Sequence, residues 1–181
     1  LVEDGNKNQL LAKELTHSGM RPIMEWKGMG LVNENFLANE LPNNTEIIAV
    51  QTQSDLAAWL HIVNTALMTS NKVDYSIFEA LYTNSNFELY LLTTNNIPVA
   101  TGLAYFANNT CGIYMIATLE EARKKGFGSA VTKHCVNAAH QKGIANIVLH
   151  ATQKGVSVYK KIGFKAACVF TIFWMLGKDY K

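Results

Sequence analysis

Three apolar segments rich in β-branched and aromatic residues follow one another closely in the second half of the chain. They read FELYLLTT (87–94), VATGLAYFA (99–107) and CGIYMIAT (111–118), and the residues between them are NNIP and NNT. Asparagine and proline are turn residues, and short apolar segments between such turns are typical of β-hairpins. The sequence therefore predicts three consecutive antiparallel strands, and any fold for this chain must contain that meander.

Helical and strand patterns surround this meander. Apolar residues recur at helical intervals in residues 8–18 and 53–68; Gly19 is expected to end the first helix and Ser54 to cap the second. Further helices are expected at 74–83, 129–142 and 154–162, and further strands at 25–32, 46–50, 145–151 and 165–176. The order of elements predicts an α/β (α+β) fold with a mixed, mostly antiparallel sheet flanked by helices, not a doubly wound fold.

Composition and charge exclude several classes of protein. A hydrophobic content of 49% with 17% charged residues is typical of an ordered globular chain. A net charge of +2 is too small to indicate nucleic-acid binding, and the apolar runs are too short to span a membrane. The spacing of Cys111, Cys135 and Cys168 predicts reduced thiols in a cytoplasmic protein without a metal site. The chain begins with LVEDG, from which we expect that an upstream segment is missing.

The residues after the third strand combine positive charge with bare backbone. Arg123, Lys124 and Lys125 precede Gly126 and Gly128, and a helix is expected directly afterwards. The first amides of a helix have no intrahelical partner and carry a partial positive charge, so this stretch suits a phosphate or pyrophosphate. The glycine spacing matches neither a dinucleotide-binding fingerprint nor a P-loop. The alternative is a solvated basic helix start whose glycines serve only the turn.

A second motif lies downstream of the glycines. The strand expected at 145–151 is followed by Thr152, by a helix containing Tyr159, and by Gly163-Phe164. With the stretch RKKGFG at 123–128, this pattern resembles the GNAT acetyltransferases, in which an R/Q-x-x-G-x-G/A loop follows a central strand. The resemblance covers residues 46–181, the expected acyltransferase domain. Residues 1–45 are expected to form an N-terminal extension, the remnant of a longer N-terminal lobe.

The resemblance implies an N-acetyltransferase that moves an acetyl group from acetyl-CoA directly to an amine of a small molecule or peptide, without a metal. In the family, backbone equivalent to Ile116, Ala117 and Thr118 pairs with the pantetheine arm of the cofactor. Thr152 stands where many members have a cofactor-contacting Asn, and it is shorter. The loop that would bind the pyrophosphate comprises Arg123, Lys124, Lys125, Gly126, Phe127, Gly128 and Ser129.

The resemblance makes Tyr159 the catalytic residue. Attack of an amine on the thioester expels a thiolate whose thiol has a pKa of about 8.5, and a phenol of pKa about 10 can donate a proton to it. The alternative is an ordinary half-buried aromatic residue on an amphipathic helix. Many family members have a Glu on the central strand as general base, which CGIYMIAT lacks. Other candidates for the base are Glu79, Asp74, Glu120 and His150, and a chain of water molecules is a further alternative.

The acceptor remains open at this point. Aromatic residues fall where the family builds its acceptor site, and those on the last strand allow core, acceptor or homodimer contacts. The first group is Tyr75, Phe78, Tyr82, Tyr105, Phe106 and Tyr114, and the second is Phe170, Phe173 and Trp174. Two alternative functions are a CoA-binding regulatory or scaffold module without turnover, and a basic nucleotide or RNA binder. We expect neither a nucleic acid nor a membrane as partner.

Overall fold

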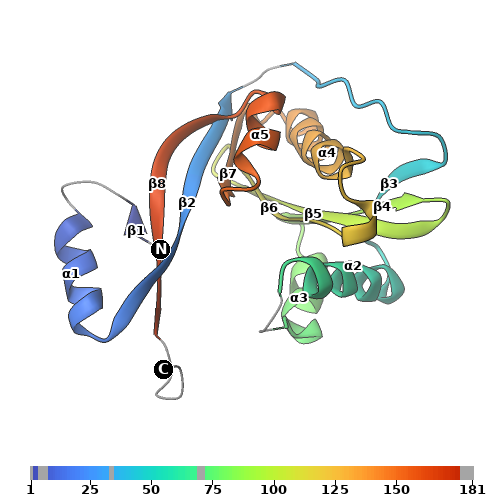
Figure 1. The fold of residues 1–181 in the computed structure, drawn as a ribbon. Coiled ribbons are helices and arrows are strands. Elements are labelled where there is room, and N and C mark those ends of the chain that lie inside the picture. Colours follow the sequence, from blue (N-terminus) through green and yellow to red (C-terminus); the bar gives the residue numbers. More distant parts are fainter. Residues whose placement is uncertain (1, 4–7, 33–34, 69–71, 176–181) are drawn as a thin grey trace. The chain divides into compact units, whose positions relative to one another are not determined.

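The predicted three-stranded meander is confirmed by the computed structural model (Figure 1). Strands β4 (Phe87–Thr94), β5 (Ile97–Ala107) and β6 (Thr110–Thr118) pair antiparallel in that order. Both connections are two-residue turns, 95–96 and 108–109, in which every asparagine has a positive φ, between 49° and 63°. Turns of this kind match the twist of the paired strands. The four-residue turn expected at NNIP is wrong, because Ile97 and Pro98 already belong to β5.

The structure describes residues 2–3, 8–32, 35–68 and 72–175. Their contacts divide the chain into a first unit, residues 1–31 with 149–181, and a second unit, residues 32–148. Strand β7 (Asn146–Ala151) runs across the division. The expected domain division between residues 45 and 46 stays a prediction.

Helices cover both faces of the sheet in the second unit. Strand β3 (Thr45–Ala49) pairs with β4, which gives the order β3–β4–β5–β6. Helices α2 (Gln53–Ala66) and α3 (Tyr75–Tyr82) lie on one face, and α4 (Phe127–Gln141) lies on the other (Figure 1). The predicted fold class, mixed α/β with mostly antiparallel strands flanked by helices, is confirmed.

Helix α2 begins at a different cap from the one expected. The hydroxyl of Thr52 accepts from the N–H of Asp55 at 3.1 Å, and the Asp55 carboxylate accepts from the N–H of Thr52 at 3.0 Å. This reciprocal capping box satisfies two backbone donors that the helix leaves without partners. The prediction of Ser54 as the N-cap is therefore wrong, and Ser54 lies inside the first turn.

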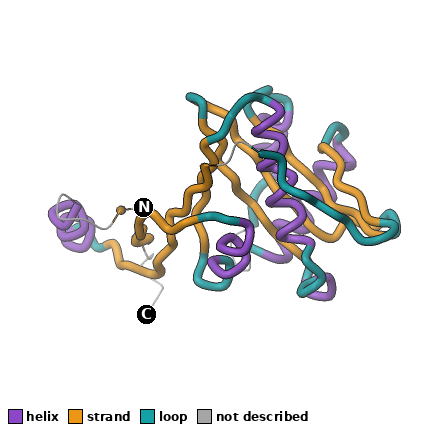
Figure 2. The backbone as a smooth tube through the Cα atoms, turned by 90° about the horizontal axis from the view of Figure 1, so that it is seen from above, coloured by secondary structure: helices purple, strands orange, loops and turns teal. Residues whose placement is uncertain are grey.

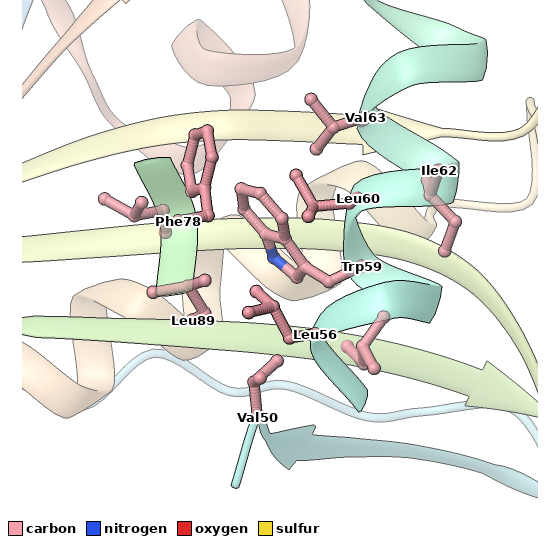
Figure 3. Packing of buried hydrophobic residues seen from close by; sticks show 11 residues of the cluster. Val50, Leu56, Trp59, Leu60, Ile62, Val63, Phe78 and Leu89 are labelled. Carbon is pink, nitrogen blue, oxygen red and sulfur yellow. The ribbon is translucent and has the colours of Figure 1, made fainter. Parts of the chain in front are cut away.

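The core of the second unit lies between α2 and the meander. Trp59 and Val63 of α2 and Leu91 of β4 are almost completely buried there. Figure 3 shows Trp59 at the centre of this cluster, and its ring packs against Phe78 of α3 with 5.0 Å between centroids. The indole N–H of Trp59 donates to the carbonyl of Gly102 at 3.1 Å, which joins the helix to the middle of β5.

Trp59→Phe is expected to lower the free energy of unfolding by about 2–3 kcal/mol, because it leaves the Gly102 carbonyl without its donor and opens a small cavity. Urea unfolding followed by circular dichroism measures this change. His61→Ala on the exposed side of α2 is the control, with an expected change within about 0.5 kcal/mol. Equal stability of Trp59→Phe and wild type would contradict a stabilising role for the hydrogen bond.

The first unit is built on a long antiparallel strand pair. Strand β8 (Lys165–Met175) pairs with β2 (Met20–Val32) from Met20↔Met175 to Gly30↔Lys165, and with β1 (Val2–Glu3) on its other side. Strand β2 is longer than the strand expected at 25–32 because β8 offers it a partner along its whole length. Helix α5 (Val156–Ile162) and helix α1 (Gln9–His17) complete the unit. Gly19 follows α1 with φ +85°, as predicted for a helix end.

An extended segment before β3 is bound across α4. The Asn137 side chain accepts from the N–H of Leu37 at 2.8 Å and donates to its carbonyl at 2.9 Å. Asn39 donates to the carbonyl of Ala130, and Lys133 donates to the carbonyl of Ala38. This segment is part of the teal loop before β3 in Figure 2.

None of the helices among the described residues is long and apolar enough to cross a membrane.

Candidate functional site

Strand β6 contains a bulge at the point where the sequence predicts cofactor contacts. Thr101 pairs with Ala117 and Leu103 pairs with Tyr114, so one residue of β5 faces two residues of β6, Met115 and Ile116. Met115 has φ +51°, an uncommon value for a residue with a side chain. The bulge interrupts the regular ladder shortly before the strand ends at Thr118, and bulges of this kind often lie next to active sites.

Buried polar groups hold the bulge in place. The hydroxyl of Thr101 donates to the carbonyl of Met115 at 2.9 Å, and Thr101 is fully buried. Gly102 stands opposite Met115 and Ile116, and its carbonyl accepts a hydrogen bond from the indole N–H of Trp59. A Cβ at Gly102 would clash with the Val131 side chain of α4, so a larger residue does not fit without a shift of its neighbours. The bulge is thus fixed from both faces of the sheet.

The basic loop connects the end of β6 to α4. A short 3₁₀ turn (Glu120–Ala122) follows the strand, and the Nε of Arg123 donates back to the carbonyl of Thr118 at 3.2 Å. Arg123, Lys124 and Lys125 are exposed, and Lys124 and Gly126 have positive φ values of +64° and +83°. The loop therefore presents three cationic side chains beside the first turn of the helix, as the sequence predicts.

The first turn of α4 offers backbone donors. Gly126 is the N-cap and has no side chain to cap the helix. The N–H of Ala130 donates to the carbonyl of Gly126 at 3.0 Å and makes the first hydrogen bond of the helix. The N–H groups of Phe127, Gly128 and Ser129 precede it and have no carbonyl partner within the helix. Such amides and the positive end of the helix dipole attract anions. With the three cations before them, they fit the pyrophosphate of a coenzyme.

Two residues of the loop join this helix end to the strand. Phe127 is buried in the core, so its ring anchors the turn and does not face a ligand. Gly128 lies against the end of β6, where a Cβ would be 3.6 Å from the hydroxyl oxygen of Thr118 and 3.7 Å from Ile116. The structure therefore brings together most of the site residues predicted in the second unit, namely Ile116, Thr118 and residues 123–129. Ala117, also predicted, faces the core.

The downstream motif lies in the first unit. Tyr159 is half-buried on α5, and its ring packs edge-on against Phe164 with 6.1 Å between centroids. A Cβ at Gly155 would lie 2.9 Å from that ring, so the glycine makes room for the tyrosine. Gly163 ends the helix with φ +116°, and Thr152 is exposed before it. The roles predicted for Tyr159 and Thr152 stay predictions.

The thiols of the second unit are unsuited to covalent catalysis. Burial raises the pKa of Cys111 to about 12, and burial raises the pKa of Cys135 well above its usual value. Thiolates are the nucleophilic form of cysteine, and both groups stay protonated at neutral pH. Within the described residues, no group of three or more His, Cys, Asp or Glu side chains is arranged to hold a metal ion.

The candidate bases differ in their surroundings. The Asp74 carboxylate caps α3 by accepting from the N–H and hydroxyl of Ser76, which lowers its pKa and occupies it structurally. Glu79 and Glu120 are exposed. His150 in the first unit is exposed, its ring contacts those of Trp26 and Phe170, and partial burial lowers its pKa. The imidazole is therefore neutral at pH 7.

The aromatic residues considered for the acceptor separate into three groups. Phe78 belongs to the core, and Phe106 is buried beneath Lys142 on the α4 face. The others lie half-buried or exposed on the side of α2 and α3: Tyr75, Tyr82, Tyr105 and Tyr114. On β8, Phe170 and Phe173 are half-buried and Trp174 is exposed.

Sequence reasoning missed the bulge and the residues that hold it. Gly102 and Gly112 interrupt strands that are otherwise β-branched, aromatic or small, and an isolated glycine in a strand pattern indicates a bulge or a close approach. That signal was available. The partners of Gly102, Trp59 and Val131, are separated from it in sequence, and no local pattern indicates them.

Comparisons with known proteins agree with this geometry. Residues 51–169 match the family model described as an acetyltransferase (GNAT) domain. No curated protein matches the sequence.

Solved structures show the same fold. A GCN5-related N-acetyltransferase from Kribbella flavida superposes with a TM-score of 0.72 at 18% identity, over 91% of this chain and 63% of that one. Another from Sphaerobacter thermophilus gives 0.76 at 14% identity, over 94% and 57%. The chain thus spans about three fifths of the length of these two proteins.

A third structure is shorter. It is that of a predicted acetyltransferase from Clostridium acetobutylicum with acetyl-CoA, and it gives a TM-score of 0.60 at 20% identity, over 68% of this chain and 91% of that one. The family model covers more than half of the chain and includes both the basic loop and the Tyr159 motif. The chain therefore belongs to the GNAT acetyltransferase family.

Proposed function

We propose that this protein is an N-acetyltransferase that moves an acetyl group from acetyl-CoA directly to an amine. The observation that carries the proposal is the uncapped start of α4 behind three exposed cations, directly after the bulged end of β6. Family membership supports acetyl transfer in general, and the Clostridium acetobutylicum relative binds acetyl-CoA in its crystal structure.

Under this proposal, the amides and the cationic side chains of the loop have different roles in binding acetyl-CoA. The N–H groups of residues 127–129 donate to the pyrophosphate, and Lys124 and Lys125 add charge around it. A pair of unit charges about 4 Å apart near a protein surface interacts with roughly 4 kcal/mol before screening by salt. The backbone of residues 116–118, which directly follows the bulge at Met115, binds the pantetheine arm and orients the thioester.

Tyr159 acts as the general acid under this proposal. The amine nitrogen forms a bond to the acetyl carbon, the carbon–sulfur bond breaks, and the phenol donates its proton to the departing sulfur. The acceptor must first lose its ammonium proton, since a lysine-like amine has a pKa of about 10.4. The raised thiol pKa values favour direct transfer over an acyl-enzyme.

Two measurements test the proposal together. Isothermal titration calorimetry with CoA measures donor binding, and thiol release from acetyl-CoA in the presence of an amine panel measures turnover. Binding with amine-dependent thiol release is the expected result. Tight CoA binding without turnover on any amine would support the non-catalytic CoA-binding module instead, and no CoA binding would refute both. Salt-dependent retention of RNA in a gel-shift assay would favour the nucleic-acid alternative.

A further inference from the structure

Charge is unevenly distributed along the chain. Residues 45–122 contain seven Asp and Glu residues and a single cation, Lys72, whereas residues 123–175 contain nine Lys and Arg residues and no acidic residue. The basic part includes the loop proposed to bind the donor phosphates. The acidic part includes α2 and α3, which cover the opposite face of the sheet in the second unit. Residues 53–66 and 74–82 of these helices contain Asp55, Asp74 and Glu79 and no Lys or Arg, so this side of the sheet is suited to a cationic ligand.

A row of aromatic rings crosses the sheet on the α2 and α3 side. Phe87 of β4 pairs with Tyr105 of β5, and their rings stack with 4.6 Å between centroids. Tyr105 pairs in turn with Gly112 of β6. The ring of Tyr114 lies over Gly112, where an added Cβ would be 2.6 Å from the Cε2 atom and 2.8 Å from the phenol oxygen. The glycine thus allows a third ring to lie beside the first two.

Helix α3 adds two more phenols and an acid. Tyr75 and Tyr82 are half-buried and pack against the same core cluster as Phe87 and Tyr105. Partial burial and the neighbouring Glu79 carboxylate raise the pKa of Tyr75. Glu79 is exposed. Glu88, by contrast, forms a salt bridge, with 2.8 Å between its Oε1 and the Nζ of Lys142, so the charge of its carboxylate is balanced.

Tyr114 is the exposed end of this row. Its side chain is 40% exposed, and the residue directly precedes Met115, where the bulge begins. A single residue, Met115, separates it along the strand from the segment 116–118 that is proposed to orient the thioester. A molecule resting on the Tyr114 ring would therefore reach the segment where the acetyl group is transferred.

We propose that this aromatic face, formed by Tyr75, Tyr82, Phe87, Tyr105 and Tyr114, binds the acceptor and selects a cationic amine on an aromatic body that carries no anionic group. The inference rests on the proposed acetyl transfer and specifies its substrate class.

The chemistry of the face supports this selection. Aromatic rings attract an ammonium group over their faces by about 0.5–1 kcal/mol at exposed sites and about 2 kcal/mol when desolvated. Stacking of an aromatic body on such rings adds about 0.5–1.5 kcal/mol. A carboxylate or phosphate on the acceptor would instead meet Glu79, with Lys72 as the sole cation between residues 45 and 122. Like charges at close range suppress the wrong ligand.

Three small amines separate the contributions of an aromatic ring and of a carboxylate to acceptor recognition. Phenethylamine carries the ring and the ammonium, phenylalanine adds only a carboxylate, and n-butylamine removes the ring. We expect the kcat/KM for phenethylamine to exceed that for each of the other two by at least about tenfold, which corresponds to about 1.4 kcal/mol. Ligand-detected NMR with the same three compounds measures binding without turnover and should give the same order.

Two variants locate the effect on the protein. Tyr114→Ala removes the exposed ring, and Gly112→Ala places a methyl group where that ring lies. Both are expected to raise the KM for phenethylamine by about tenfold and to weaken its NMR binding, with the KM for acetyl-CoA unchanged. Phe36→Ala removes an exposed aromatic ring elsewhere in the second unit and is the control, with no expected change.

The outcomes distinguish this inference from the proposed function. Selective, Tyr114-dependent binding of phenethylamine without turnover on any amine would refute acetyl transfer and support the aromatic face as an amine-binding site. Equal use of phenylalanine and phenethylamine, or phenethylamine kinetics and binding unaffected by Tyr114→Ala, would overturn the inference even if acetyl transfer occurs. Absence of any amine binding by NMR would overturn it as well.

Discussion

Gly126→Asp is expected to weaken CoA binding by at least about 100-fold, equivalent to about 2.7 kcal/mol. Gly126 is the N-cap of α4 and has open space around it, so the new carboxylate would lie at the mouth of the predicted pyrophosphate site. It would accept from the free amides of the first turn and would repel the phosphates that they are proposed to bind. Isothermal titration calorimetry with CoA measures the loss.

Gly126→Asn is the matched control for this prediction. Asn has the same shape as Asp and also tolerates the φ of +83° at this position, but it carries no charge. We expect the Asn variant to retain most of the affinity and both variants to unfold at similar urea concentrations. Equal CoA affinity of the Asp variant and wild type would show that this loop does not bind the pyrophosphate.

Tyr159→Phe is expected to lower kcat by about 10²-fold or more, within the range that general acids contribute, while the KM for acetyl-CoA changes little. The substitution keeps the ring that packs against Phe164 and removes only the hydroxyl group that would protonate the leaving sulfur. Steady-state thiol release with phenethylamine or any active amine measures the effect.

Ser157→Ala removes a hydroxyl group from the exposed side of the same helix and serves as the control for Tyr159→Phe. Its kcat should match that of wild type. A wild-type kcat for Tyr159→Phe would remove the acid role of the phenol. A large increase in the KM for acetyl-CoA with unchanged kcat would instead assign Tyr159 to donor binding.

Local sequence signals were sufficient for most helices and strands of this protein. The asparagine pairs at 95–96 and 108–109 predict the two hairpin turns because asparagine readily adopts a positive φ. Gly19 and Gly163 predict helix ends for the same reason. The cap of α2 was predicted two residues too late, since Ser54 is also a good N-cap residue and only the pairing of Thr52 with Asp55 decides between them.

The candidate site was predictable in part. The basic loop and the glycines are consecutive in sequence, so their position at the start of α4 followed from the strand and helix patterns on either side. The aromatic face was only a set of scattered residues, because the stacking of Phe87 on Tyr105 and the position of Tyr114 over Gly112 depend on the register of three strands.

The sequence by itself determined the order of elements and the positions of the two hairpin turns, because each depends on residues close together in the chain. The two motifs at 123–128 and 159–164 indicated the acetyltransferase family. Only the tertiary structure decided the bulge at Met115 and the hydrogen bonds from Thr101 and Trp59 that hold it. Those contacts join residues 14 and 43 positions apart; the first forms when β5 pairs with β6, and the second forms only once the meander has folded against α2. A register of pairing is a property of two strands together, and neither strand alone encodes it.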